Sequence, residues 1–159
     1  MIKVLEFEPR FAALLPETHE LLLFSNLTVH LAVSRIILHG SRGPARKNRP
    51  DSDIDLSLVI EPEPESPIQE SFLQEIFNMT KSSWKGPVEL DLAVVFEIQP
   101  CKLNCFDQIV WADQACKLGG MDCFGLYKIG KGFNGYVRDA GIEVKRMYPC
   151  IKIWQRNNG

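Results

Sequence analysis

The sequence Leu38-His39-Gly40-Ser41, followed after eleven residues by Asp53-Ile54-Asp55-Leu56, is the stretch that decides the fold. Residues 35–38 form a short, mostly apolar run that ends just before a glycine, which predicts a buried strand. Residues 53–60 begin with alternating polar and apolar side chains, which is typical of a second strand. The intervening residues 41–52 are rich in Gly, Pro, Arg and Lys and are predicted to form a loop.

Asp53 and Asp55 are the first candidate site residues. Side chains two positions apart on a strand point to the same face, so these carboxylates are expected side by side, with Ile54 and Leu56 buried on the opposite face. Adjacent carboxylates repel each other, and one stays protonated unless a cation lies between them. A hard divalent ion such as Mg²⁺ prefers these oxygen ligands. The alternative interpretation, for an Asp-x-Asp sequence taken alone, is a solvated turn.

Asp91, in Leu90-Asp91-Leu92, supplies a third carboxylate on the next predicted strand. By itself it is a candidate for a solvated strand end. Gly40 allows a ligand to approach the backbone closely, and Ser41 offers a hydroxyl and an N–H to a phosphate oxygen. Phosphate at such a turn, beside carboxylates that hold Mg²⁺, is the arrangement that phosphoryl-transfer chemistry needs.

The loop that follows Ser41 carries four basic residues. Two interpretations stay open for them: binding of a triphosphate or acceptor, or a solvated loop. For Arg42, nearest the glycine turn, the two are balanced, and for the others solvation is favoured. The four residues are Arg42, Arg46, Lys47 and Arg49.

Local patterns elsewhere predict helices and strands in mixed order. Residues 16–30 and 68–81 have helical spacing of apolar residues, the second with Ser66 as cap and Pro67 in the first turn. Residues 88–96 predict a third strand. Residues 105–117 and 134–140 suggest helices, with Gly141 ending the second, and residues 142–144 and 148–154 suggest terminal strands. This order predicts an α/β or α+β sheet with helices packed on it.

Composition limits the class of protein. The 159 residues are 45% hydrophobic and 24% charged, with a net charge of −2, which fits one domain in the cytoplasm. The basic excess of nucleic-acid-binding proteins is missing, which argues against nucleic acid as a partner. No apolar run has the length of a membrane span, and the N-terminus lacks a signal-peptide pattern. The five cysteines are irregularly spaced, which favours reduced thiols over a zinc site.

The Gly40-Ser41 turn, the Asp53-Ile54-Asp55-Leu56 element and the later Leu90-Asp91-Leu92 element together resemble the signature of the DNA polymerase β-like nucleotidyltransferase superfamily. The sequence from residue 49 to residue 56 is especially similar to the minimal nucleotidyltransferases. His39 stands where the family usually has an apolar residue or tyrosine, which suggests a tolerated strand residue rather than a catalytic one. The resemblance covers residues 30–96 well.

The resemblance implies one nucleotidyltransferase domain over residues 1–159, a small mixed sheet flanked by helices, with its core in residues 16–96 and a divergent extension in residues 97–159. It implies that two Mg²⁺ ions are held by Asp53, Asp55 and Asp91. It further implies that a nucleoside triphosphate, usually ATP, is bound at Gly40, Ser41 and Arg42. The reaction would transfer a nucleoside monophosphate to an acceptor hydroxyl and release pyrophosphate.

Other functions compete with this one. Minimal nucleotidyltransferases are often antitoxins encoded beside an RNase-type toxin, and this chain could act by binding or by modifying such a partner. Aminoglycoside-modifying enzymes carry a large helical second domain for which this chain has little room. Template-directed polymerisation is disfavoured by size and charge. The acceptor is not revealed, and a second copy or a partner protein could complete the site.

Overall fold

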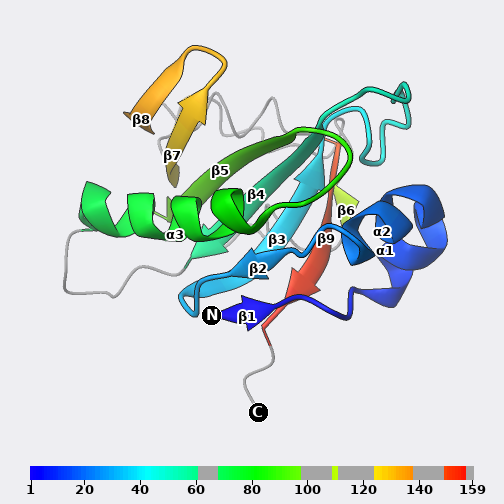
Figure 1. The fold of residues 1–159 in the computed structure, drawn as a ribbon, viewed down its shortest axis with the longest axis horizontal. Helices are drawn as coiled ribbons and strands as arrows, with labels where there is room; N and C mark the ends of the chain where they lie inside the picture. The colour runs from blue at the N-terminus through cyan, green and yellow to red at the C-terminus, as the bar shows by residue number, and fades with distance from the viewer. Residues whose placement is uncertain (61–67, 98–108, 111–123, 138–148, 157–159) are drawn as a thin grey trace.

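The computed structural model describes residues 1–60, 68–97, 109–110, 124–137 and 149–156 and has a mixed α+β architecture (Figure 1). Its main feature is a seven-stranded sheet. In spatial order the strands are β6 (Ile109–Val110), β9 (Cys150–Gln155), β3 (Val33–His39), β4 (Ile54–Ile60), β5 (Leu90–Glu97), β7 (Phe124–Gly130) and β8 (Phe133–Val137). The neighbours β4 and β5 are parallel, and the other neighbouring pairs are antiparallel. The sheet confirms the predicted mixed class.

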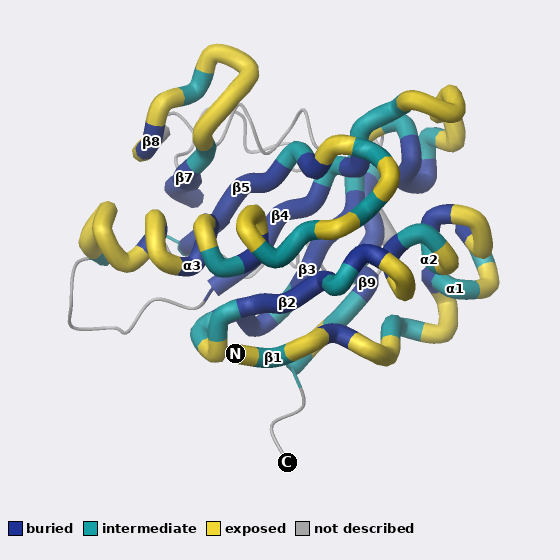
Figure 2. Tube along the Cα trace, viewed as in Figure 1, coloured by how far each residue is buried: buried dark blue, intermediate teal, exposed yellow. Residues whose placement is uncertain are grey.

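Three helices cover one face of this sheet: α1 (Pro9–Leu14), α2 (Pro16–Leu23) and α3 (Glu70–Ser83). A small separate pair, β1 (Ile2–Lys3) with β2 (Thr28–Val29), lies beside them. Alternate strand residues point to the helices and form the core, which makes the central strands the most buried part of the chain (Figure 2). The main core side chains are Phe11, Leu22, Ile36, Leu38, Leu56, Leu58, Leu73, Ile76, Phe77, Leu92 and Val94.

Helix α3 confirms the helix predicted from residues 68–81. Its buried residues Leu73, Ile76, Phe77 and Thr80 recur every three or four positions, so one stripe faces the sheet. Each large apolar side chain buried there contributes roughly 1.5–3 kcal/mol. The helix begins at Glu70, after an N-cap residue without a side-chain cap. The predicted cap lies outside the described residues.

The helix predicted over residues 16–30 is too long. Helix α2 ends at Leu23, because Asn26 adopts a left-handed conformation with φ 56° and the chain then enters β2. The Asn26 side-chain amide donates a hydrogen bond to the carbonyl of Ser83, 3.1 Å away, which fixes this turn against the end of α3. Beyond Leu23, Phe24 is therefore exposed, whereas Leu27 and Val29 are buried in the core, just before and within β2, rather than on a helix face.

The C-terminal third differs most from the prediction. The helix expected from residue 134 is wrong over the described part, where β8 pairs with β7 in a hairpin, and residues 138–140 lie outside the described ranges. In the helix expected over residues 105–117, the two described residues form β6. The predicted final strand is confirmed as β9, which lies between β6 and β3 in the sheet, whereas residues 142–144 are outside the described part. Strands from this third thus belong to the same sheet as residues 33–97.

A membrane-spanning helix is not found among the described residues: none of their helices combines the necessary length with the necessary apolar character.

Candidate active site

Two of the predicted carboxylates meet because of the register of β4 and β5. These parallel strands begin at the same edge of the sheet, and Asp55 is the direct partner of Asp91. On the other side, β3 places His39 opposite Asp55. Since Ile54 and Leu56 face the helices, these three side chains lie on the sheet face that α1, α2 and α3 leave uncovered. The meeting of Asp55 and Asp91 is therefore a feature of the fold.

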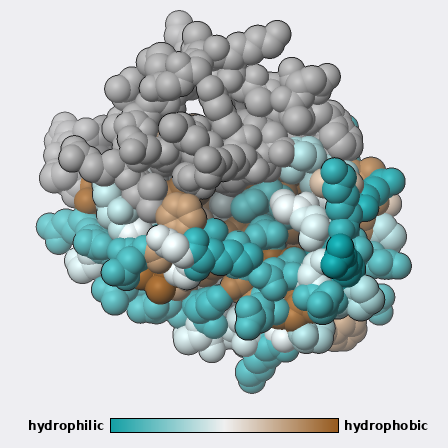
Figure 3. All heavy atoms as spheres, turned by 90° about the horizontal axis from the view of Figure 1, so that it is seen from above, coloured by the Kyte–Doolittle hydropathy of each residue, from teal (hydrophilic) through white to brown (hydrophobic). Residues whose placement is uncertain are grey.

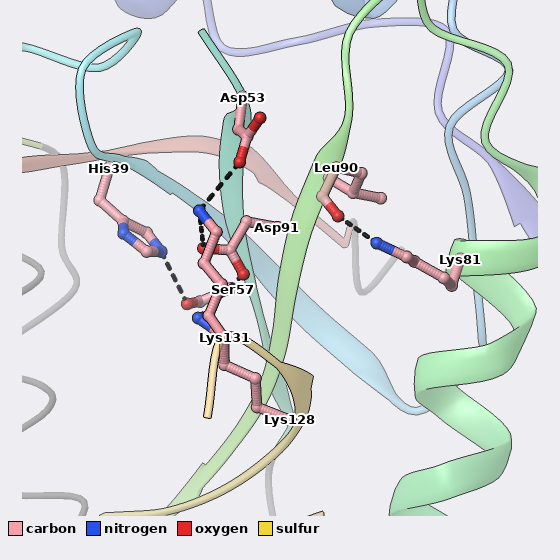
Figure 4. A network of polar contacts seen from close by, with 8 residues as sticks. All are labelled: His39, Asp53, Ser57, Lys81, Leu90, Asp91, Lys128 and Lys131. Carbon is pink, nitrogen blue, oxygen red and sulfur yellow. Dashed lines mark hydrogen bonds and ion pairs between the residues drawn. The ribbon is translucent and has the colours of Figure 1, made fainter. Parts of the chain in front are cut away.

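Asp53 joins them through a lysine from the β7–β8 hairpin. The ammonium nitrogen of Lys131 lies 2.9 Å from Asp53 Oδ2 and 3.2 Å from Asp91 Oδ2. A second lysine, Lys128 on β7, places its Nζ 2.9 Å from Asp91 Oδ1. Figure 4 shows both lysines pointing at the carboxylates from one side. The site is thus a cluster of acids and lysines, not of acids alone.

The two facing carboxyl groups differ in proton affinity. Burial, together with the hydrogen bond and the charge of Asp91, raises the pKa of Asp55 from 3.8 to about 7. Burial would also raise the pKa of Asp91, but its contacts with Asp55, Lys128 and Lys131 outweigh burial and hold that pKa well below its ordinary value. The pair therefore keeps one proton on Asp55 below neutral pH while Asp91 stays ionised.

The turn that carries Lys131 is a two-residue hairpin loop. Gly130 pairs with Phe133, and both loop residues have positive φ, 51° at Lys131 and 88° at Gly132. Positive φ at both positions matches a type I′ turn, whose twist suits a hairpin. The contact with Asp53, and then the one with Asp91, keep the pKa of Lys131 above its ordinary value, so this lysine is a permanent cation of the site.

Gly40 directly follows β3, and its backbone lies against Asp55. Its φ is +73°, and a Cβ at this position would lie 2.0 Å from Asp55 Oδ2. Only glycine allows the backbone to pass this close to the carboxylate in this conformation. The structure thus brings the predicted glycine turn and the predicted carboxylate into contact. Phosphate binding by Gly40 and Ser41 stays a prediction.

Arg42 has a structural function in the loop. Its side chain is buried, and its guanidinium donates to the carbonyls of Ser52, Pro50 and Arg49 at 2.7, 3.0 and 3.2 Å. Its own carbonyl accepts a hydrogen bond of 2.9 Å from the hydroxyl of Thr18 on α2. Arg42 therefore ties together the two ends of the loop that connects Gly40 to Asp53. Its predicted part in nucleotide binding stays a prediction.

His39 lies beside the carboxylates and is half-buried. Its Nε2 is 3.0 Å from the hydroxyl oxygen of Ser57 on β4. Burial, and then the positive charge of Lys128, lower the pKa of His39 from 6.5 to about 4, so the imidazole is neutral at physiological pH. Ser57 was not recognised from the sequence, although it continues the alternation from Asp53 and Asp55.

Helix α3 fixes the first residue of β5. Lys81, in the last turn of the helix, donates a hydrogen bond to the carbonyl of Leu90, immediately before Asp91 (Figure 4). The backbone amide of Ile54 donates to the carbonyl of Glu89 at 2.9 Å, so the starts of β4 and β5 are also joined. These bonds hold the backbone that carries Asp55 and Asp91.

As the side chains stand, the described ranges contain no group of three His, Cys, Asp or Glu side chains arranged to hold a metal ion. The donor set nevertheless has the chemistry that Mg²⁺ prefers, because all three predicted ligands are carboxylates. The ammonium of Lys131, in contact with Asp53 and Asp91, marks where a cation is accommodated between them. The residues therefore fit a divalent ion on condition that Lys131 moves away.

Sequence reasoning missed both lysines of the site. The signal available was the Gly-Lys-Gly run at residues 130–132, a basic residue between glycines that allow a tight turn. In the view of Figure 3, the described residues show more hydrophilic than hydrophobic side chains, with hydrophobic ones scattered among them. Comparisons with protein-family models, curated proteins and solved structures found no match to this chain.

Proposed function

We propose that this protein is a metal-dependent nucleotidyltransferase that transfers AMP from ATP to an acceptor hydroxyl and releases pyrophosphate. The observation that carries the proposal is the direct pairing of Asp55 with Asp91 across parallel strands, in contact with Gly40 and bridged to Asp53. Three carboxylates gathered at a glycine turn match the signature from which the proposal began. The nucleotidyltransferase fold is part of the same proposal.

In this reaction the chain's residues have separate functions. Asp53, Asp55 and Asp91 would hold Mg²⁺, which when bound stabilises negative charge on the attacking and leaving oxygens. Gly40 and Ser41 would accept the phosphates at the end of β3. The acceptor oxygen forms a bond to the α-phosphorus as the bond to pyrophosphate breaks, and the acceptor's proton passes to a carboxylate, for which the ionised Asp91 is the candidate.

A second function is favoured by the lysines. Lys128 and Lys131 already neutralise Asp53 and Asp91, so the cluster is satisfied without any metal. This observation favours a regulatory binding protein, such as an antitoxin that covers a toxin, in which the acidic cluster is structural. The two functions differ in whether Asp53 and Asp55 are needed for transfer.

The deciding experiment mixes the purified protein with Mg²⁺, α-labelled ATP and a native cell extract. We expect label on a specific acceptor, and no label with the Asp53→Asn/Asp55→Asn variant. The matched control is Asp51→Asn, an exposed acid of the same loop outside the cluster, which should label as well as wild type. Equal labelling by wild type and the double variant would overturn the proposed metal site. Failure of the wild type to bind ATP–Mg²⁺ would overturn the transferase and leave the regulatory binding protein as the remaining candidate function.

A further inference from the structure

We propose that Lys131 is a mobile ligand-binding residue: it occupies the cation position between Asp53 and Asp91 in the empty site, and moves to the polyphosphate of the nucleotide when a divalent ion binds. The proposal rests on the proposed function. It adds a substrate-binding residue that lies outside the signature formed by the Gly40-Ser41 turn and the three aspartates. It also specifies the substrate class as a nucleoside polyphosphate, because the displaced ammonium needs an anionic partner beyond the metal.

The first argument is the place of the ammonium. Lys131 Nζ contacts one oxygen from each of two carboxylates, at 2.9 and 3.2 Å, and both carboxylates are predicted metal ligands. A divalent ion bound between the same oxygens would repel this ammonium and would need the space that it occupies. The two cations therefore exclude each other. Lys131 must therefore leave its partners before both Asp53 and Asp91 can bind one ion.

The second argument is that Lys131 is placed so that it can leave. Its side chain is 56% exposed, whereas that of Lys128 is 16% exposed and lies over the ring of Phe133, with Nζ 5.2 Å from the ring centre. Gly130 and Gly132 flank Lys131, and a Cβ at either glycine would meet nothing within 4 Å. Within the described part of the chain, nothing is thus packed against the two glycines at the tip of the hairpin, while Lys128 is held on the strand.

The third argument is chemical. Lysine is a compact point charge on a flexible chain, and it binds phosphate oxygens without the fixed geometry that arginine requires. Arg42, the arginine nearest to the glycine turn, is buried with its guanidinium bonded to three loop carbonyls. Among the described residues at the carboxylate cluster, Lys131 is therefore the cation best placed to reach a phosphate.

The test is a pair of binding measurements with effects of opposite sign. Titration calorimetry measures Mn²⁺ alone, and then Mn²⁺ with an ATP analogue that has a methylene group between the α- and β-phosphorus. In Lys131→Met we expect Mn²⁺ alone to bind about three- to tenfold more tightly, because a competing, largely exposed ion pair is gone. The Mn²⁺–analogue complex should bind about tenfold more weakly, because one charge-assisted contact to phosphate is lost.

Three further proteins make the result specific. Lys131→Arg should retain most of the nucleotide affinity, since the charge remains. Lys3→Met removes an exposed lysine on β1 and should match wild type in both titrations. Lys128→Met should not reproduce the pair of opposite effects, because that lysine stays on the strand in both states. Circular dichroism spectra of the variants serve to check that each one is folded.

The outcomes separate this inference from the proposed function. If wild type binds the analogue in a manner that needs Asp53, and Lys131→Met changes neither titration or changes both in the same direction, the inference is overturned and the proposed function stands. If wild type binds neither Mn²⁺ nor the analogue, both are overturned. Opposite effects in Lys131→Met, absent from Lys3→Met, support the inference.

Discussion

The contact between Gly40 and Asp55 yields the sharpest prediction about this site. In Gly40→Ala, the new Cβ would meet Asp55 Oδ2 at 2.0 Å and its carboxyl carbon at 2.7 Å, far inside van der Waals contact. The φ of +73° adds strain of its own for any residue with a Cβ. The carboxylate, or the turn, has to move.

The cost has two parts that can be separated. The left-handed conformation costs alanine roughly 1–2 kcal/mol relative to glycine. Displacing a packed side chain adds about 1–3 kcal/mol, the range for overpacking a core. We therefore expect Gly40→Ala to lower the free energy of unfolding by about 2–5 kcal/mol, from a total that is on the order of 5–15 kcal/mol for a domain.

Urea unfolding of four proteins measures the second part: wild type, Gly40→Ala, Asp55→Ala and the double variant. With the carboxyl group gone, the nearest remaining atom of Asp55 is its Cβ at 3.1 Å, a contact that a shift of a few tenths of an ångström relieves, so backbone strain should make up most of the remaining cost. Gly40→Ala should then cost about 1–2 kcal/mol in the Asp55→Ala background. Gly132→Ala, at φ +88° with open space around its Cβ, is the control for strain alone. Equal costs of Gly40→Ala in both backgrounds would refute the reasoning.

Three other predictions concern the same framework. Because burial and Asp91 raise the pKa of Asp55 from 3.8 to about 7, the native state holds more protons than the unfolded state between these values, and this group's contribution to stability falls as pH rises. As pH rises from 4.5 to 8, the unfolding free energy of Asp55→Asn should therefore increase relative to that of wild type by about 1–2 kcal/mol, a figure discounted for solvent screening of this partly exposed side chain, in urea unfolding with chelator present. Arg42→Met should lose about 2–4 kcal/mol and expose the loop to trypsin, and Arg42→Lys should not restore it, since one ammonium cannot reach three carbonyls. Thr80→Val should cost about 1–2 kcal/mol of thermal stability, because the Thr80 hydroxyl donates a buried hydrogen bond of 2.8 Å to the carbonyl of Thr28.

Local patterns predicted the strands that carry the carboxylates. The apolar run in β3 and the polar–apolar alternation at the starts of β4 and β5 are clear, Asp55 and Asp91 lie on strands whose other face is buried, and Asp53 immediately precedes β4. What alternation cannot supply is register. The direct pairing of Asp55 with Asp91 depends on long-range alignment of two strands separated by α3, which no local pattern specifies.

The lysine half could not be predicted from local patterns. The sequence of residues 134–137 suggests the start of a helix that ends at Gly141, and the glycines at 130 and 132 suggest a loose segment before it. The conformation of residues 134–137 as part of β8 depends on pairing with β7, which in turn pairs with β5. Because β7 runs antiparallel to β5, its end arrives where β5 begins, and that topology brings Lys128 and Lys131 to Asp91.

Stability does not account for the lysine at the hairpin tip. A non-glycine residue with φ 51° carries strain of about 1 kcal/mol, and type I′ turns favour asparagine at this position. Ion pairs of a side chain that is 56% exposed return only about 0–1 kcal/mol. The free energy gained from the ion pairs and the cost of backbone strain nearly cancel, so stability gives no reason for a lysine here. The two candidate functions assign Lys131 different roles: ligand binding in the transferase, and neutralisation of a structural acidic cluster in the binding protein.

Lys131→Asn distinguishes them. If Lys131 serves ligand binding, the Asn-Gly turn should fold at least as stably as wild type, within about 0.5 kcal/mol or better, while nucleotide affinity falls. If the acidic cluster is structural, as in a pure binding protein, removal of the cation leaves Asp53 without its ion pair and Asp91 with Lys128 alone, and urea unfolding should show a loss of about 1 kcal/mol. A stable variant with unchanged nucleotide affinity would deny Lys131 either function, because neither the turn nor the carboxylates would then depend on its charge.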